Sequence, residues 1–135
     1  MKTQIKLLLP LLIFLAFSTA GADDAQNANE LGKAMRKDMA INFMCQEYLG
    51  GLSSYRVAKL SSITTFTRIT GDKNKAVLSI DSFEKTLKTS NASSDLKKRF
   101  DKMNLSEIDR MSTCQDMVAE SYDKVQVLKA KLGLL

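Results

Sequence analysis

The side chains that could do chemistry in this sequence are sulfur groups and carboxylates, because the chain contains no histidine. Histidine is the commonest general base near neutral pH, the usual partner of a nucleophilic Ser or Cys, and a frequent zinc ligand. A pair of carboxylates facing across a cleft remains as a catalytic arrangement, but no spacing in the sequence marks one among Glu47, Glu84, Glu107 and Glu120. We therefore expect no catalytic residue, no cofactor and no enzymatic activity.

The two cysteines, Cys45 and Cys114, form an even pair. In an oxidising compartment such a pair is more often bridged than free. A bridge would close a long loop and stabilise the fold by about 4 kcal/mol in the chain-entropy model. Because small domains have a net stability of roughly 5 to 15 kcal/mol, we expect this disulfide to supply a large share of it.

Methionine sulfur suggests a second chemistry. Met35 and Met39 are one helical turn apart, and Met111, Cys114 and Met117 follow one another at steps of three. Soft sulfur ligands suit Cu(I), so a copper carrier could use such a stripe. Methionine at helical spacing is more often flexible core filler, and a disulfide would withdraw the Cys114 thiolate. We interpret these residues as core and expect no metal site.

The N-terminal segment has the pattern of a cleaved secretory signal. Lys2 and Lys6 precede an apolar stretch from Leu7 to Phe17, which is too short to span a bilayer, and Ala20-Gly21-Ala22 matches a signal-peptidase site. We predict that residues 1–22 are removed. Residues 23–135 would then form a single helical domain without a stable membrane anchor, exported to the periplasm or secreted.

Charge argues against a nucleic-acid partner. Removing Lys2 and Lys6 would lower the formal net charge from +5 to +3. The basic run at residues 97–99 lies between Asp95 and Asp101 and has no accompanying set of aromatic side chains for base stacking. We interpret the run as a solvated helix face and expect a protein partner; a homodimer is also compatible with the sequence.

The first half of the exported chain predicts two helices. Apolar residues recur at steps of three and four from Leu31 to Leu52, while the polar residues 23–30 before them are expected to be frayed. Gly50-Gly51 should end or bend this first helix, and Ser53-Ser54 could cap the next segment.

That next segment, from Tyr55 to about Thr70, could be a helix or a strand. β-branched residues are frequent in 63–70 and would suit a strand. A helix is favoured, because a single strand without a partner would leave its backbone groups unpaired.

The second half predicts two or three more helices. After a break at Gly71-Asp72, one helical face carries Ala76, Ile80, Phe83 and Leu87. Residues 90–94 form a polar loop ending in an N-cap for a helix that carries Leu96, Phe100 and Met103.

The last apolar stretch runs from Ile108 to Leu132. Asn104 with Glu107 is typical of a capping box before it, and Ser112 with Gln115 could divide it into two helices. The sequence therefore predicts an all-α bundle of four to five helices, with the disulfide between its first and last helices.

The segments around the cysteines, residues 43–48 (FMCQEY) and 112–117 (STCQDM), resemble those of a known family. With the signal and the short helical chain, they make the sequence similar to the small periplasmic immunity proteins that bacteria produce against type VI secretion amidase effectors. The resemblance spans most of the exported chain in outline and about a dozen residues in detail. It carries over no inhibitory residue.

The resemblance implies that the protein occludes the active site of a peptidoglycan-degrading toxin, so the partner would be a cell-wall amidase effector. Loops on rigid scaffolds often carry recognition, which favours two loops as the contact region. The residues predicted to contact the partner are Asp72, Lys73, Asn74, Asn91 and Ser93.

The alternative function is a small periplasmic chaperone of the helical, single-disulfide kind that acts in acid stress. Without histidine, an acid switch would need carboxylates such as Glu47, Asp109 or Asp116 to be protonated below about pH 5. Partner breadth distinguishes the two functions, because a chaperone would bind many unrelated proteins in acid, whereas an immunity protein would bind one toxin at neutral pH.

Overall fold

The computed structural model describes the backbone of residues 2–135 and the side chains of residues 23–135. Its helices are α1 (Lys2–Met44), α2 (Ser53–Thr70), α3 (Lys73–Thr89), α4 (Ala92–Lys102) and α5 (Glu107–Lys131). Because the described chain contains these five helices and no strand, the predicted all-α class is confirmed. The predicted signal, residues 1–22, lies outside the residues whose side chains are described, so its cleavage stays a prediction.

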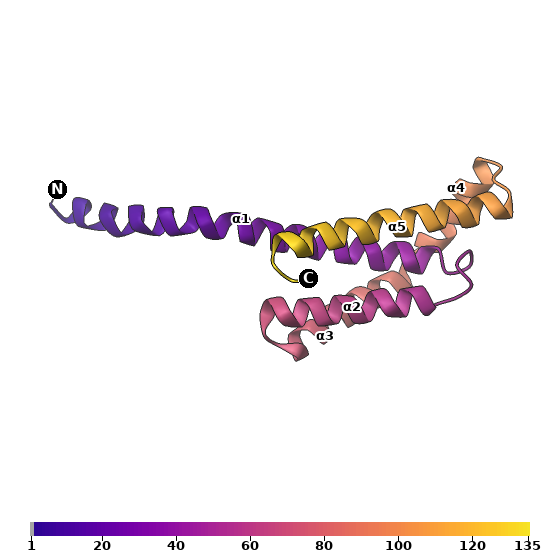
Figure 1. Cartoon of the computed structure of the whole chain (residues 1–135), viewed down its shortest axis with the longest axis horizontal. Helices are drawn as coiled ribbons and strands as arrows, with labels where there is room; N and C mark the ends of the chain where they lie inside the picture. The colour runs from indigo at the N-terminus through magenta and orange to yellow at the C-terminus, as the bar shows by residue number, and fades with distance from the viewer. Residues whose placement is uncertain (1) are drawn as a thin grey trace.

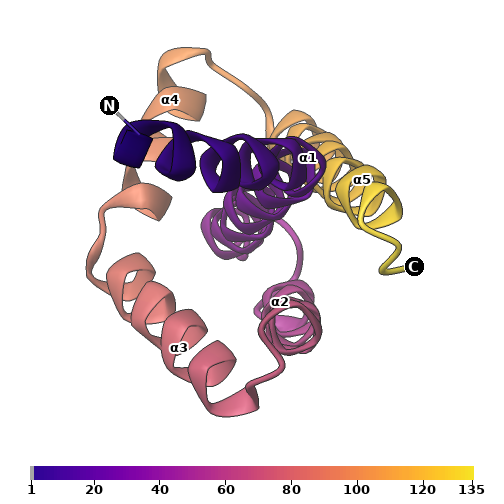
Figure 2. The ribbon, with the colours of Figure 1, turned by 90° about the vertical axis from the view of Figure 1, so that its left-hand side faces the viewer.

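Helix α1 is the element on which the others pack. Figure 1 shows α5 running back along α1, with α2 and α3 forming a hairpin on the other side and α4 at the far end. Figure 2, which looks along α1, shows the other four helices arranged around it. Helix α1 packs chiefly on α5 and α2, and α2 packs on α3. Over the part of the chain that was searched, no helix has the length and apolar character needed to cross a bilayer.

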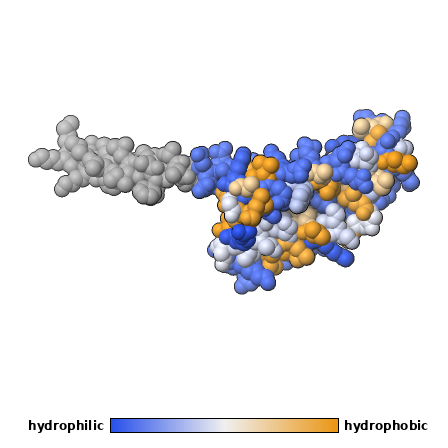
Figure 3. Space-filling view, in the orientation of Figure 1, coloured by the Kyte–Doolittle hydropathy of each residue, from blue (hydrophilic) through white to orange (hydrophobic). Residues whose placement is uncertain are grey.

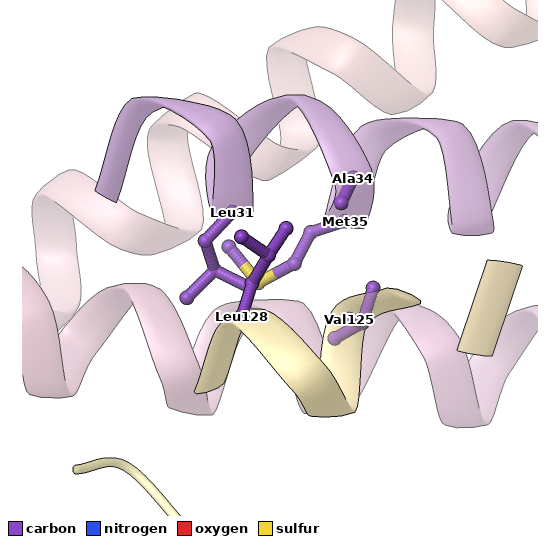
Figure 4. Close-up of a cluster of buried hydrophobic side chains, with 5 residues drawn as sticks. All are labelled: Leu31, Ala34, Met35, Val125 and Leu128. Atoms are coloured by element: carbon purple, nitrogen blue, oxygen red, sulfur yellow. The ribbon is translucent and has the colours of Figure 1, made fainter. Parts of the chain in front are cut away.

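One core cluster joins α1 to α5 near the C-terminal end of α5. Leu31, Ala34 and Met35 of α1 contact Val125 and Leu128 of α5, and all five are buried. Figure 4 shows these side chains meeting between the two helices. Their spacing of three and four on each helix produces the apolar stripes that meet here.

A second cluster surrounds the disulfide between Cys45 and Cys114, whose Cα atoms are 5.7 Å apart. Both cysteines are fully buried, and Ile41, Leu96 and Phe100 pack with them, which brings α4 against the same end of α1. The predicted bridge between the first and last helices is therefore confirmed. It ties the residue that directly follows α1 to the early part of α5.

The α2–α3 hairpin has a cluster of its own, in which Met39 of α1 meets Tyr55 and Ala58 of α2 and Ile80 and Leu87 of α3. The segment from Tyr55 to Thr70, which had both helix and strand interpretations, is thus a helix. Its buried positions are satisfied by packing on α1 and α3, and its backbone groups are paired within the helix.

Helix α1 differs from the sequence prediction in two places. Residues 23–30, expected to be frayed, are helical, and α1 ends at Met44 instead of near Gly50. A turn over residues 45–50 follows, and Gly50 and Gly51 then adopt φ values of 81° and 121°. Glycine tolerates these values without a Cβ clash, so the pair reverses the chain into α2.

Three predicted helix caps are wrong. Leu52 occupies the N-cap position of α2, and the hydroxyl of Ser54 contacts the Asn42 side chain instead of capping. Helix α4 begins at Ala92, so the predicted loop at 90–94 ends earlier than expected. Ser106 caps α5, because Asn104 adopts a left-handed φ of 52°, whereas the extended Ser106 accepts from the Asp109 amide at 3.1 Å.

The predicted break within the last helix and the predicted position of Met103 are also wrong. Helix α5 is unbroken from Glu107 to Lys131, so Ser112 and Gln115 do not divide it. Helix α5 is continuous because it packs on the α1 side of the fold near both of its ends, at Cys114 and at Leu128. Met103, predicted to lie on the same helix as Leu96 and Phe100, directly follows the last residue of α4 and is 65% exposed.

Candidate functional site

A groove opens between α2 and α5, with α1 as its floor. The two outer helices both pack on α1, and Lys129 Nζ donates to Ser61 Oγ across them at 3.3 Å. The groove has a volume of about 800 Å³. Figure 3, in the orientation of Figure 1, shows that hydrophobic and weakly polar side chains are interspersed with hydrophilic ones on this face of the molecule. This is a long surface on which a helix or an extended segment of another protein could lie.

The floor of the groove carries a buried polar network built on Asp38. Ser121 donates its hydroxyl to Asp38 Oδ1 at 2.6 Å, and Asn42 Nδ2 donates to Oδ1 at 3.3 Å and to the Asp38 carbonyl at 2.7 Å. Ser54 in turn donates to Asn42 Oδ1. The network therefore links α1 to both α2 and α5 at the centre of the groove.

The charged form of the Asp38 carboxylate is poorly solvated, because only 9% of the residue is exposed. Loss of solvent raises its pKa, and this effect outweighs the hydrogen bonds from Ser121 and Asn42 and the positive charge of Lys129, which lower it. The described residues donate no hydrogen bond to its Oδ2. Asp38 thus keeps acceptor capacity beneath the groove.

The walls of the groove bear exposed apolar side chains. Val57 of α2 is 68% exposed and Tyr122 of α5 is 55% exposed, and both line the groove with the smaller Ala58 and Ala119. Val57 and Tyr122 therefore give each of the two walls one large apolar side chain that solvent or another molecule can reach.

Two basic side chains, Lys129 and Arg68, are near the C-terminal ends of α5 and α2. Lys129 lines the groove; desolvation and then repulsion from Arg68 lower its pKa, and these effects outweigh the attraction to Asp38, which raises it. Arg68 donates to the carbonyl of Leu134 at 2.6 Å. Among the described residues, neither cation forms an ion pair with a carboxylate.

A second polar cluster holds α2 to α3, away from the groove. Glu84 accepts from the Tyr55 hydroxyl at 2.7 Å, and its two carboxylate oxygens lie 3.1 Å from Lys59 and 3.2 Å from Lys88. The Tyr55 hydrogen bond is the largest cause that lowers the Glu84 pKa, to about 2, and the two lysines lower it further. Lys59 also contacts Asp81 at 3.0 Å.

The loop residues predicted to contact a partner do not form one surface. Asp72 caps α3, its carboxylate accepting from the Lys75 amide at 3.1 Å, and Lys73 and Asn74 form the first turn of that helix. Asn91 and Ser93 are at the start of α4, beyond the other end of α3. A 17-residue helix separates the two sets, which at 1.5 Å per residue places them roughly 25 Å apart.

Of the methionines considered as copper ligands, Met35 and Met39 are in the core, whereas Met111, also interpreted as core, is 42% exposed. Met35 and Met39 are 2% and 0% exposed, and they belong to different clusters, one facing α5 and the other facing α2 and α3. Cys114, between Met111 and Met117, is in the disulfide. Within the searched residues, no group of three or more His, Cys, Asp or Glu side chains could hold a metal ion.

Sequence reasoning missed Asp38, although a signal for it was present. Asp38 and Asn42 are one helical turn apart within an otherwise apolar stretch that includes Met39 and Ile41. Two polar residues at such spacing on a helix that packs on both sides indicate a buried network or a binding site. Ser121, the partner of Asp38, is 83 positions away, so its role required the fold.

Comparison with known proteins found no match: no family model, curated protein or solved structure is significantly similar to this chain.

Proposed function

We propose that this chain is an exported protein-binding inhibitor of the immunity class, and that the groove between α2 and α5 is its docking surface. In this proposal the partner is a peptidoglycan-cutting amidase delivered as a toxin, and the protein blocks its active site. The observation that carries the proposal is the groove itself, with Val57 and Tyr122 exposed on its opposing walls.

Two features of the fold support binding as the activity. The disulfide and the packing of α1 on α5 hold the floor and one wall of the groove in place, which limits the ordering cost of association. The buried disulfide is also consistent with an oxidising compartment, where cell-wall amidases act on their substrate. The resemblance of the segments around Cys45 and Cys114 to amidase-immunity proteins suggests the class of partner.

The test is inhibition of an amidase effector by the purified, oxidised protein, measured as release of soluble peptidoglycan fragments. We expect inhibition to reach completion at one inhibitor per enzyme. Val57→Asp should weaken inhibition at least about tenfold, because a carboxylate would have to be desolvated in the docked groove.

The matched control is Leu78→Asp, which changes an apolar residue of similar exposure, 70%, on α3 outside the groove. It should leave inhibition unchanged. Equal losses in the two variants would contradict the groove as docking surface, and failure to inhibit any amidase would contradict the immunity function.

The Glu84 cluster favours the second candidate function, an acid-stress chaperone. Glu47, Asp109 and Asp116, the carboxylates first considered as acid switches, are exposed and form no ion pair with the described residues. Glu84, in contrast, holds α2 to α3 through Tyr55 and two lysines. Its protonation in strong acid would loosen the hairpin and uncover the apolar cluster beneath.

The chaperone function predicts that the protein suppresses aggregation of several unrelated proteins near pH 2 to 3 and does not do so at pH 7. Light scattering of acid-denatured test proteins measures this directly. Glu84→Gln should shift the onset of chaperone activity toward neutral pH, because the hairpin would be loosened before acidification; an unchanged onset would contradict the role of Glu84.

A further inference from the structure

We propose that residues 132–134, which directly follow α5, are a clasp that holds the α2 wall of the groove at its distance from α5, and that release of this clasp widens the groove. The inference goes beyond the proposed function, because it concerns how the groove opens and not which partner occupies it. Only its consequence for docking rests on that function.

The clasp is formed by the way in which α5 ends. Gly133 adopts a left-handed φ of 66°, and its amide donates to the Ala130 carbonyl at 3.1 Å. The Leu134 amide donates to the Lys129 carbonyl at 2.9 Å. These two bonds form a Schellman motif, in which the apolar residue after the glycine turns back toward the helix that has just ended. Leu132 and Leu134 are accordingly half-buried and pack on the core cluster shared by α1 and α5.

From this position Leu134 also reaches α2. Arg68 Nη1 donates to the Leu134 carbonyl at 2.6 Å. Phe66 of α2 packs on the same core cluster as Leu134, and Ile69 lines a hollow together with Leu132 and Leu134. Figure 1 shows the chain turning from the end of α5 toward α2. The clasp therefore joins the C-terminal ends of the two helices that form the walls of the groove.

The groove ends where the clasp begins. Its lining residues on α2 lie between positions 54 and 61, and those on α5 lie between positions 115 and 129. Phe66, Leu132 and Leu134 lie beyond these limits, on the core cluster of α1 and α5. Helices α2 and α5 each pack on α1 but share few direct contacts. The clasp and the hydrogen bond from Lys129 to Ser61 therefore link the two walls at this end of the groove.

The contacts of the clasp are suited to release. Arg68 is exposed, so water can replace its hydrogen bond to Leu134 at little cost, and the Leu134 side chain is only half-buried. The disulfide and the buried cluster between α1 and α5 do not depend on these contacts. Release would therefore free the C-terminal end of α2 while α1 and α5 keep their positions. A wider groove would admit a partner segment more easily.

The experiment measures the distance between α2 and α5 in the oxidised protein, expressed from its full sequence, with and without the clasp. Spin labels carried by noncanonical amino acids at Thr64 and Asp123, which are exposed and do not line the groove, leave the disulfide intact. Deleting residues 133–135 should broaden the distribution of distances toward longer values. In hydrogen exchange, the amides of residues 62–70 should exchange about tenfold faster, with no change in α1.

A milder variant and a matched control make the test specific. Gly133→Ala keeps every apolar side chain of the clasp but places a Cβ at a left-handed φ, so it should change both measurements in the same direction by a smaller amount. Leu135→Ser changes the neighbouring residue, which is 74% exposed, and should leave both unchanged. Equal changes in this control, or an unaltered distance and exchange rate after the deletion, would overturn the clasp.

Failure of the clasp can be told apart from failure of the proposed docking surface. An unaltered distance and exchange rate would overturn the clasp, whereas inhibition of an amidase and its sensitivity to Val57→Asp would be unaffected. A protein that inhibits no amidase can still show the wider groove after the deletion. That result would support the clasp and contradict the immunity function.

Discussion

The α1–α5 pair and the α2–α3 hairpin are held together in different ways. The pair has a buried disulfide at one end and an apolar cluster at the other. The hairpin contains no cysteine; it packs on α1 through one apolar cluster that includes Met39, and polar contacts around Glu84 join its two helices. Because the groove has α5 as one wall and α2 as the other, its shape depends on a fixed wall and a noncovalently held one.

This difference suggests where flexibility would serve binding. A groove with one adjustable wall can close on a partner at little cost, while the opposite wall and the floor keep their positions. The following predictions test whether the two regions differ in stability as their contacts imply, beginning with the largest effect.

Removing the disulfide should be the most damaging change. In Cys45→Ser/Cys114→Ser, the free energy of unfolding should fall by about 4 kcal/mol, because the 69-residue separation adds loop entropy to the unfolded chain. Urea titration followed by circular dichroism measures the loss. A loss under about 1 kcal/mol would show that packing, and not the bridge, holds α1 to α5.

Weakening the apolar core of the hairpin should lower the free energy of unfolding by less than removing the disulfide does. The effect should be confined to α2 and α3. Ile80→Ala removes a side chain that is 3% exposed and packs on Met39 and Tyr55, so we expect a loss of about 2 to 4 kcal/mol. In hydrogen exchange, the amides of α2 and α3 should exchange faster, with little change in α1 and α5.

Leu78→Ala, a change at an exposed position of the same helix, serves as the control and should cost less than about 0.5 kcal/mol. Uniform acceleration of exchange in all five helices after Ile80→Ala would contradict a separately held hairpin.

The hairpin should lose stability in acid through Glu84. Its folded pKa, about 2, is below the unfolded value, so its stabilising contribution is complete above about pH 5 and is lost as the pH falls toward 2. Since the lysine partners are partly exposed, we expect a contribution of about 1 to 2 kcal/mol.

Unfolding free energies of the protein and of Glu84→Gln between pH 2 and 6 check this. The variant should be less stable at pH 6 and should lack most of the dependence on pH. Parallel curves for the two proteins would contradict the role of Glu84.

Asp38 should act in the opposite direction and have the smallest effect. Its folded pKa is raised, so the neutral form is favoured by folding, and this contribution to stability is complete at low pH and is lost as the pH rises through the folded pKa. In Asp38→Asn this pH-dependent contribution disappears, and we expect the free energy of unfolding at pH 7 to change by about 1 kcal/mol or less.

Carboxyl carbon chemical shifts of Asp38, followed by NMR during a pH titration, give its pKa directly. A value at or below that of an exposed aspartate would contradict the desolvation argument, and with it the contrast between the two carboxylates.

Much of the fold could be predicted from the sequence, because helical periodicity is a local property. The apolar spacing in residues 31–52, 76–87 and 108–132 marked three of the helices, and the cysteine pair marked the bridge. The ends of the helices were less predictable. Ser54 and Asn104 have the residue types of caps, but tertiary contacts and backbone conformation assigned them other roles.

The candidate site was much less predictable. The loop residues selected from the sequence lie at opposite ends of α3, whereas the groove is lined by residues from helices. Val57 and Tyr122 have nothing in their sequence context that separates them from core residues. Their exposure follows from α2 and α5 packing on α1 and leaving the space between them open.

The sequence by itself determined the helical class, the number of helices to within one, and the disulfide, since each depends on spacing along the chain or on residue type. Only the tertiary structure decided that Asp38 meets Ser121, that Lys129 donates to Ser61, and that a groove remains between α2 and α5. The physical reason is that side-chain periodicity specifies which face of a helix is buried, whereas the set of neighbours on that face depends on how all five helices pack together.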